Sequence, residues 1–490
     1  MLPSTAYGDS HLSFWPRVRE FAVPPSMIET AGSRRSVGDW AGACAAAGFD
    51  ADLDLRSLAR THGRAIAGQV RADLRQLVPD LLRWHMPRIA PDGLLRPGLT
   101  IALARYGGTG RTDPDPVHLV VRTPPAWADG GQRMSLTLWG DHRLGVPGWG
   151  AAGGAPGHPH PHPHPRYRLD LHRHLWDARR TDELRERAGA DGTDGPAGLD
   201  GPAGSEPRPA DGSPVTDPEV RTAVPPGTRC ATGRWADESR LLLGSQGRSA
   251  GPVSVRLAAG RRLNLELVED PYGLRPPTLR LAAGPPDSGD LPLVLPDAAT
   301  WVLPDLDLIR AGAIEVGSLH PLVASALVPD RGPGPGRVPQ RRGRADGSRV
   351  VECRGERHRI GLVDGVLAPL DHHPAEIRRE ELLFALHGPP LPCLRAIDEA
   401  HRRPACLTGV RERLDHGDIS GALAVVEQLL GPEAALRGGP LRDELEAAAQ
   451  RRIAYGLYRA GLMGPGPDRL PPRSPRPRGL RSRPRSTQGR

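Results

Sequence analysis

Residue types that commonly bind metals gather in the C-terminal third of this 490-residue chain. Within a short stretch lie His373, His387 and Cys393, and imidazole and thiolate groups are ligands that zinc prefers. We therefore take these three residues as candidate zinc ligands. Their spacing matches no established metal motif and no H-E-x-x-H occurs, so surface histidines that cap helices are the alternative interpretation. The wider group of ionisable residues comprises His358, Asp371, His372, Glu380, Glu381, His401, Cys406 and His416.

A second run of histidines alternates with proline at His158, His160, His162 and His164. This alternation favours polyproline II geometry, which has about three residues per turn. Successive imidazoles then point in different directions, so the segment has no preformed metal-binding site. We interpret the run as a repeat inside a linker rather than as a metal site.

Two segments resemble known catalytic motifs, but the residues within or after them do not match what those motifs require. The GRSAG segment around Ser249 matches a nucleophile elbow, but strand-like residues follow it where that motif needs a helix. The glycine-rich segment Tyr106–Thr112 resembles a phosphate loop without its lysine. All 65 basic residues are arginine, so no lysine is present for Schiff-base chemistry. These observations favour a protein that is not an enzyme.

A short motif, G-D-x-x-G-A, occurs at Gly38–Ala43 and again at Gly417–Ala422. Glycine can end one helix, aspartate can cap the next, and a small residue one turn later lets the two helices approach closely. Each copy resembles the turn of tetratricopeptide-type helical hairpins, and that resemblance implies a protein-binding helical repeat. An ordinary helical hairpin with the same turn chemistry is the alternative.

The formal charge of +8 resides in segments that are poor in apolar residues. Residues 469–490 carry eight arginines and no acidic residue, and residues 331–349 carry six arginines against one aspartate. Such segments do not build a core, so the rest of the chain is mildly acidic. The tail can attract nucleic-acid phosphates, but it has no aromatic residue to stack on bases.

The composition also bears on the origin and location of the protein. Abundant glycine (60) and proline (55), with no lysine, resemble the uncharacterised proteins common in Streptomyces-like, high-GC actinobacteria. The five cysteines form no C-x-x-C pair, which argues against a disulfide framework or a zinc ribbon. Because no signal-peptide core and no membrane-spanning apolar run occur, we predict a cytoplasmic protein without a membrane partner.

The hydrophobic pattern predicts an α+β fold with helical N- and C-terminal segments, a β-rich middle and long disordered linkers. A single sheet split by an insertion is favoured over two separate β domains. The predicted segments are a loose arm (1–23), a helical segment (24–92), a β-rich segment (97–144), a low-complexity insertion (145–227), a β-rich segment with short helices (228–328), a basic linker (329–347), a β-hairpin (348–373), a helical domain (374–463) and a disordered Arg/Pro-rich tail (464–490).

Three functional hypotheses follow. The first is a non-catalytic protein-interaction protein, an adaptor or regulatory subunit, whose partner is another protein. The second is a metal-dependent hydrolase or nuclease built around the C-terminal His/Cys/Glu cluster. The third is a nucleic-acid-associated protein that acts through residues 469–490. No cofactor is predicted, except zinc under the second hypothesis.

Overall fold

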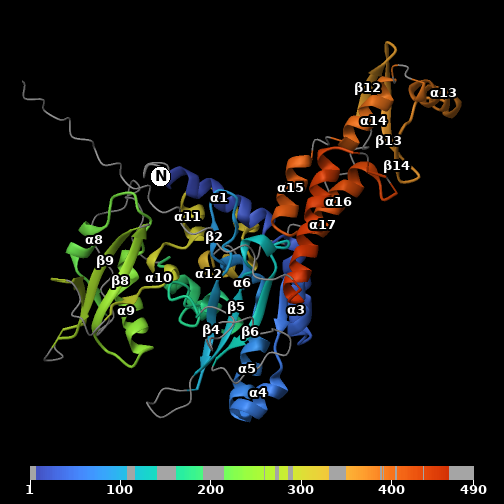
Figure 1. Ribbon diagram of the computed structural model, residues 1–490. Helices are drawn as coiled ribbons and strands as arrows, with labels where there is room; N and C mark the ends of the chain where they lie inside the picture. The colour runs from blue at the N-terminus through green and yellow to red at the C-terminus, as the bar shows by residue number, and fades with distance from the viewer. Residues whose placement is uncertain are drawn as a thin grey trace, which may run out of the picture.

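The computed structural model confirms the α+β fold, with helices at both ends and small sheets between them (Figure 1). Its elements fall into an N-terminal body (7–190 and 304–327), a middle body (214–300) and a C-terminal module (349–462). No helix among the described residues is both long and apolar enough to cross a membrane. The structure describes residues 7–107, 116–140, 162–190, 214–258, 260–270, 275–284, 291–329, 349–386, 389, 391–402, 406–433, 435–436 and 438–462.

The N-terminal body is built on a four-stranded sheet in the order β1-β6-β5-β4, in which only the β1–β6 pair is parallel. Helices pack around it and share its apolar core. Its first elements are α1 (Tyr7–Phe21), α2 (Pro25–Ser36), α3 (Trp40–Ala46), β1 (Phe49–Asp52), α4 (Leu55–His62), α5 (Arg64–Gln76), α6 (Pro79–His85), β2 (Arg88–Ile89), β3 (Leu94–Leu95), β4 (Thr100–Tyr106), β5 (Val117–Arg122), η2 (Ala126–Ala128) and β6 (Met134–Trp139).

Two predictions for the first 92 residues are wrong. The segment predicted as a loose arm forms helix α1, because Phe14 and Val18 lie one turn apart and pack into the core. Residues 49–52, inside the segment predicted as helical, form strand β1. Phe49 is buried there and the backbone pairs with β6, so tertiary pairing overrides the local helical pattern.

The predicted low-complexity insertion, 145–227, contains folded structure in its described parts. Residues 162–190 form η3 (Arg173–Leu175), η4 (Ala178–Glu183) and α7 (Leu184–Arg187). The indole of Trp176 is completely buried in the N-terminal core. His158 and His160 lie outside the described residues. The sparse apolar residues of this segment therefore build core structure despite its polar composition.

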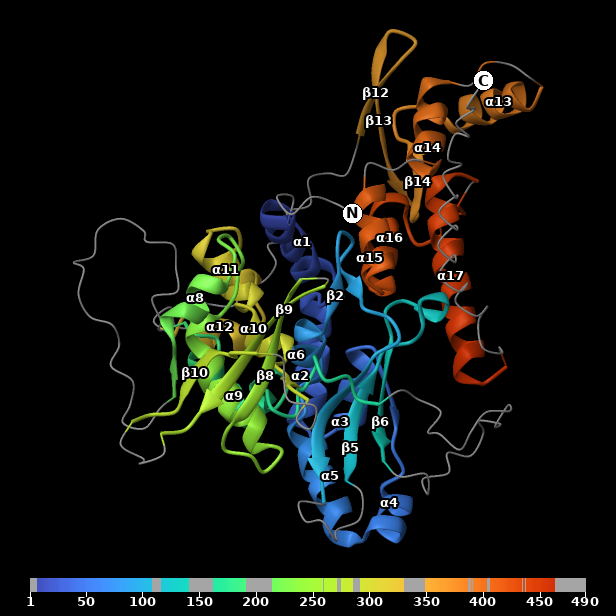
Figure 2. The ribbon, with the colours of Figure 1, turned by 60° about the vertical axis from the view of Figure 1, so that its left-hand side comes forward.

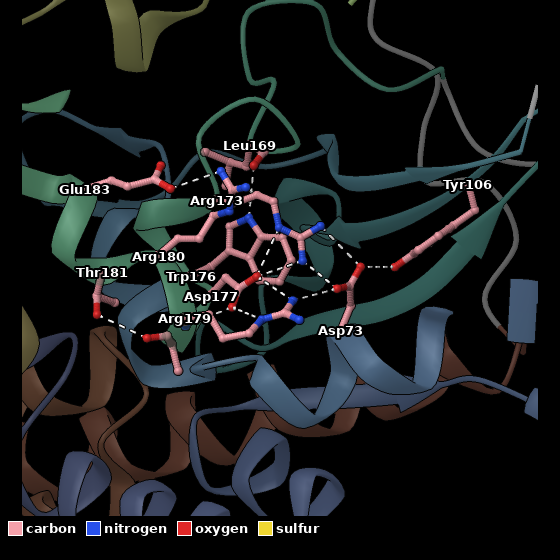
Figure 3. A network of polar contacts seen from close by, with 11 residues as sticks. Asp73, Tyr106, Leu169, Arg173, Trp176, Asp177, Arg179, Arg180, Thr181 and Glu183 are labelled. Atoms are coloured by element: carbon pink, nitrogen blue, oxygen red, sulfur yellow. Dashed lines mark hydrogen bonds and ion pairs between the residues drawn. The ribbon is translucent and has the colours of Figure 1, made fainter. Parts of the chain in front are cut away.

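Ion pairs fix this segment to helix α5 (Figure 3). Asp73 of α5 accepts hydrogen bonds from Arg173 at 2.5 Å and from Arg179 at 3.1 Å. The hydroxyl of Tyr106 donates to the same carboxylate at 2.8 Å. Asp177 lies beside both arginines and accepts from them as well, at 2.7 and 3.0 Å. Because every charge in this network is paired, we interpret its role as structural: it holds residues 173–179 against α5.

The middle body has a separate five-stranded sheet, ordered β11-β8-β9-β10-β7, and its own apolar core. The two β-rich segments therefore form two sheets, not the single split sheet favoured by the sequence. The chain then returns to the N-terminal core. The elements are β7 (Val215–Thr216), α8 (Pro218–Ala223), η5 (Thr232–Arg234), α9 (Trp235–Gly244), β8 (Gly251–Ala258), β9 (Arg261–Val268), β10 (Thr278–Leu281), β11 (Leu293–Val294), α10 (Asp297–Thr300), α11 (Pro304–Arg310), η6 (Val316–Ser318) and α12 (Pro321–Leu327).

The C-terminal module combines the predicted hairpin, extended by a third strand, with the predicted helical domain. Figure 2 shows its sheet and α13 projecting away from the two other bodies. It contains two small apolar cores, one among the helices and one between the sheet and α14. Its elements are β12 (Arg349–Cys353), β13 (Glu356–Val363), β14 (Val366–Pro369), α13 (Pro374–Ala385), α14 (Pro392–Arg402), α15 (Leu407–Asp415), α16 (Ile419–Leu430) and α17 (Pro440–Arg459).

Helix α17 docks the C-terminal module on the N-terminal body. Arg459 pairs with Asp52 at the edge of the first sheet, with an Nη1–Oδ2 distance of 2.5 Å. The ring of Tyr458 contacts Trp127 edge to face, with centroids 5.4 Å apart. These contacts bury one end of α17 against the N-terminal body. The sheet β12–β14, at the other end of the module, does not contact the described residues of that body (Figure 1).

Both G-D-x-x-G-A turns adopt the predicted cap. Asp39 accepts from the backbone N–H of Gly42 at 2.8 Å, and Asp418 accepts from that of Gly421 at 3.0 Å. A Cβ at either glycine would overlap the capping carboxylate as it is placed here, so the carboxylate would have to shift to accommodate a larger residue. The alanine that follows each glycine is fully buried, as expected for close helix approach. The turns thus join α2 to α3 and α15 to α16.

We expect acid to destabilise the N-terminal body through His85. Its Nδ1 lies 3.1 Å from the Leu175 carbonyl, its Nε2 is buried without a hydrogen-bond partner, and burial lowers its pKa to about 4. The unfolded chain binds this proton near pH 6.5, as free histidine does. The contribution of His85, on the order of 2–3 kcal/mol, is therefore complete above about pH 6.5 and lost as the pH falls to about 4.

Urea denaturation at a series of pH values measures this effect. The free energy of unfolding should fall across that window, and His85→Gln should reduce the slope. An unfolding free energy that stays constant between pH 6.5 and 4 would show that the imidazole is not held in its neutral form.

Candidate functional site

The sheet of the C-terminal module is shaped by two tight turns. Arg354 and Gly355 join β12 to β13, and Asp364 and Gly365 join β13 to β14. All four residues have positive φ angles, between 50° and 86°, as two-residue type I′ turns require. The first turn places Cys353 at the end of β12, beside the start of helix α14.

Three potential metal ligands from separate elements meet at this point. Cys353 ends β12, His372 lies in the loop between β14 and α13, and Cys393 lies in the first turn of α14. Their two Sγ atoms and one imidazole nitrogen all lie within 4.8 Å of one another. Both cysteines are 0% exposed and the His372 side chain is 4% exposed. Among the described residues, this is the one such group of three metal-binding side chains.

One of the three predicted ligands lies in this cluster. Cys393 lies in the cluster, but His373 is exposed and its Nδ1 instead accepts the backbone N–H of Ala375 at 3.2 Å, at the start of α13. His387 lies outside the described residues. His372, the immediate neighbour of His373, occupies the cluster position instead. Cys353 was missed, although its place just before a hairpin turn is visible in the sequence.

Polar contacts orient His372. Its Nδ1 lies 3.4 Å from Oε2 of Glu376, one helical turn away, and its Nε2 is buried without a hydrogen-bond partner. The preceding Asp371 accepts the backbone N–H of Arg359 at 2.6 Å and its guanidinium at 2.8 Å. These hydrogen bonds from Arg359 hold the pKa of Asp371 at about 2, so its carboxylate stays charged and fixes the loop.

A fourth nitrogen donor lies beside the cluster. The ring of His358 stacks on that of His372, with centroids 4.1 Å apart and an angle of 11° between the planes. Its Nδ1 is buried without a hydrogen-bond partner. His358 pairs with Val351 across the sheet, and side chains alternate along a strand, so it lies on the same face as Cys353. Two buried and unpaired imidazole nitrogens therefore accompany two buried thiols.

Without an ion the Cys393 thiol is protonated at neutral pH. Burial, followed by the hydrogen bond with Cys353, raises the pKa of the Cys393 thiol to about 12. Thiols of this kind are poor nucleophiles at neutral pH. The cluster therefore does not resemble the activated cysteine of an enzyme.

Solvent access also argues against catalysis at the cluster. A catalytic metal keeps one coordination position open to water or substrate, whereas structural sites are closed by protein ligands. Here the cysteines have no exposed surface. The two clearest cavities of the described residues, of about 500 and 230 Å³, lie between the N-terminal body and α17 and between the N-terminal body and the middle body, and none of the cluster residues lines them. The hydrolase hypothesis thus gains no support from this geometry.

Exposed apolar side chains form a second feature of the module. Val350, Val363 and Val366 lie on the sheet face opposite to Cys353, as the strand register and the alternation of side chains dictate. Leu370 lies over Gly361 on the same face. Among the described residues, only Val37, Leu241 and Leu291 are comparably exposed large apolar residues outside 349–462.

Helix α13 is the most exposed element of this module. No described residue of the helix is buried, and Leu382, Leu383 and the adjoining Leu386 are 61, 51 and 80% exposed. Two ion pairs from Arg354 reach the first two turns of the helix, at Glu376 and Glu380. Helix α13 lies to one side of the sheet, as Figures 1 and 2 both show.

The remaining sequence motifs are not part of this site. Ser249 is exposed between α9 and β8, so a helix precedes it and a strand follows, the reverse of a nucleophile elbow. Most of the glycine-rich segment after Tyr106, like the tail 464–490, lies outside the described residues.

No protein-family model, curated protein sequence or solved structure matches this chain. No residue role can therefore be transferred to it from a relative. The function has to be inferred from the surfaces and contacts of this chain alone.

Proposed function

We propose that this chain is a non-catalytic interaction protein, an adaptor or regulatory subunit, which binds another protein through the leucine face of α13. The observation that carries this proposal is the exposure of Leu382, Leu383 and Leu386 on a helix with no buried described residue. Contiguous exposed apolar residues are typical of protein–protein interfaces.

The length of α13 supports a partner. An isolated helix of about 12 residues is marginal in water, because most helical stability comes from packing of an apolar face. Helix α13 has 12 residues and presents that face to solvent. Full burial of a leucine side chain contributes about 1.5–3 kcal/mol, so three leucines supply enough energy for a specific complex.

The spacing of the leucines indicates the kind of partner. Leu382 and Leu386 lie one helical turn apart, and Leu383 lies beside them, which is the pattern of helices that dock in apolar grooves. Arg378, Arg379 and Glu381 are exposed around this face and would form a polar rim. We infer a partner with an apolar groove bordered by charged residues of both signs.

We expect the triple variant Leu382→Glu, Leu383→Glu, Leu386→Glu to lose its partner. Wild-type and variant chains would be immobilised and exposed to an extract of the source organism, and retained proteins quantified by mass spectrometry. At least one protein should be retained at near-equal stoichiometry by the wild type and depleted about 30-fold or more by the variant, because apolar anchors dominate interface energies.

A matched control carries Val37→Glu and Leu241→Glu, which are exposed apolar residues outside the module. The control should retain the partner. Equal loss in both variants, or equal retention in both, would contradict the proposal. Light scattering of the purified wild-type chain separates binding to another protein from self-association, since a concentration-dependent dimer abolished by the triple variant would also contradict it.

A further inference from the structure

We propose that Cys353, His372 and Cys393, with His358 as the fourth ligand, bind one zinc ion that fastens the sheet of the C-terminal module to α14. The four side chains come from β12, β13, the loop before α13, and the first turn of α14. Measurement of zinc needs only the isolated chain, so this inference does not depend on the proposed partner.

The distances between the three converging ligands are close to those of a zinc site. Zinc–sulfur bonds of about 2.3 Å place two thiolates of a tetrahedral site about 3.8 Å apart. The ligand atoms of Cys353, His372 and Cys393 are already within 4.8 Å of one another. An ion at their centre would therefore draw them together by about an ångström or less. Thiolate and imidazole ligands in a tetrahedral arrangement favour zinc over magnesium or calcium.

The surroundings of His372 favour metal binding. In zinc sites the second ring nitrogen of a ligating histidine usually donates its proton to a carboxylate or carbonyl. Glu376 stands at this position, 3.4 Å from Nδ1 of His372, which leaves the buried and unpaired Nε2 for an ion. Such a buried polar atom without a partner is otherwise costly. A bound ion would satisfy it.

The fourth position falls to His358. A closed structural site needs four protein ligands, and the burial of both cysteines excludes water from much of this one. His358 supplies a buried nitrogen without a hydrogen-bond partner, in a ring stacked on that of His372. Binding of both histidines to one ion requires that one ring rotates out of this stack. The resulting Cys2His2 set is a common structural zinc combination.

The position of the site explains why the module needs an ion. The core between the sheet and α14 contains only five buried residues, two of which are Cys353 and Cys393 themselves. A core of this size stabilises a small unit poorly, and natural small domains add metals or disulfides for this purpose. One ion here would connect the end of β12 to the start of α14. On binding Zn²⁺, each thiol releases its proton to solvent and both sulfurs bind as thiolates.

Zinc content of the untagged, full-length chain, purified under reducing conditions, tests the proposal. Inductively coupled plasma mass spectrometry should find about one more zinc per chain in the wild type than in the Cys353→Ser, Cys393→Ser variant. The His-Pro run is common to both chains, so its zinc cancels in the difference. Cys406→Ser, which removes a cysteine of the same module outside the cluster, should keep the wild-type content.

Cobalt substitution provides a readout that does not require the variants to fold. Cobalt added to the metal-free wild-type chain should give thiolate-to-cobalt absorption and the strong visible bands of a tetrahedral site. His358→Gln should weaken zinc binding at least about tenfold and reduce these bands. Unchanged binding in that variant would overturn the assignment of the fourth ligand.

Three results would overturn the site itself. One is the absence of any excess zinc over the double variant after zinc has been supplied to the reduced chain. Another is stoichiometric occupation by a different metal in its place. The third is a Cys353–Cys393 disulfide in protein isolated without added oxidant, detected by peptide mass spectrometry.

Discussion

Replacement of Asp305 by alanine should lower the free energy of unfolding by about 3–5 kcal/mol. Asp305 and Arg19 form an ion pair with side chains 0 and 2% exposed, and Arg19 donates to both carboxylate oxygens, at 2.9 and 2.7 Å. The indole N–H of Trp84 donates to the same carboxylate at 3.1 Å. Burial lowers the pKa of Arg19, whereas the neighbouring Asp305 raises it. Without Asp305, the buried guanidinium of Arg19 would have no carboxylate to balance its charge.

Urea denaturation of the purified chain measures this loss. The control is the double variant Arg19→Met, Asp305→Leu, which removes both charges and keeps a similar volume. It should recover much of the stability, because an apolar pair can replace a buried ion pair at little cost. A single Asp305→Ala variant as stable as the wild type would show that the pair is solvated. It would also contradict the placement of α1 in the core.

Arg83→Met should lower the free energy of unfolding by a similar amount, about 3–5 kcal/mol, and uncouple the C-terminal module. The Arg83 side chain is buried and donates to the backbone carbonyls of Ala22 at 2.8 Å, Gln132 at 2.7 Å and His416 at 2.9 Å. Burial lowers its pKa to about 10, so it remains charged at neutral pH. Methionine would leave three buried carbonyl groups without a donor, each at a cost of about 1–3 kcal/mol.

Differential scanning calorimetry should detect the uncoupling as a new, separate transition, because His416 belongs to the module and the other two carbonyls to the N-terminal body. Arg411→Met provides the comparison. Arg411 also lies in the module, but its ion pair with Glu444 is half exposed and contributes little. A single, unshifted transition in Arg83→Met would show that this arginine does not join the two parts.

The sequence predicted those elements whose signals are local. The caps at Asp39 and Asp418 depend on residues a few positions apart, and both are present as expected. The helices of 374–463 are likewise encoded by apolar spacing within each helix. Local turn chemistry and periodicity are thus reliable here, even in a chain rich in glycine and proline.

The errors concern segments whose structure depends on distant partners. Helix α1 is held by Asp305, far along the chain, and residues 162–190 are held by Asp73 and by burial of Trp176. Hydrophobic patterning cannot reveal such pairings, because a polar segment gives little indication of which distant residue will neutralise its charges. The separation of the two sheets was missed for the same reason.

The residues predicted as metal ligands lie in the same part of the sequence as the cluster, but only Cys393 belongs to it. Adjacent histidines point in different directions, so a shift of one position separates His372, which faces Cys393, from His373, which caps a helix. Cys353 joins them only because the β12–β13 hairpin folds back over α14. That arrangement is a property of tertiary structure and has no spacing signature in the sequence.

The most direct test of the proposed function is the affinity of the purified chain for the partner it retains, measured by isothermal titration calorimetry. We predict that Leu382→Glu, Leu383→Glu, Leu386→Glu raises the Kd by at least about 30-fold, with circular dichroism unchanged, because the leucines are exposed in the free chain. The Val37→Glu, Leu241→Glu control should bind as the wild type does. A triple variant that binds within about twofold of the wild type would contradict the assignment of α13 as the binding surface.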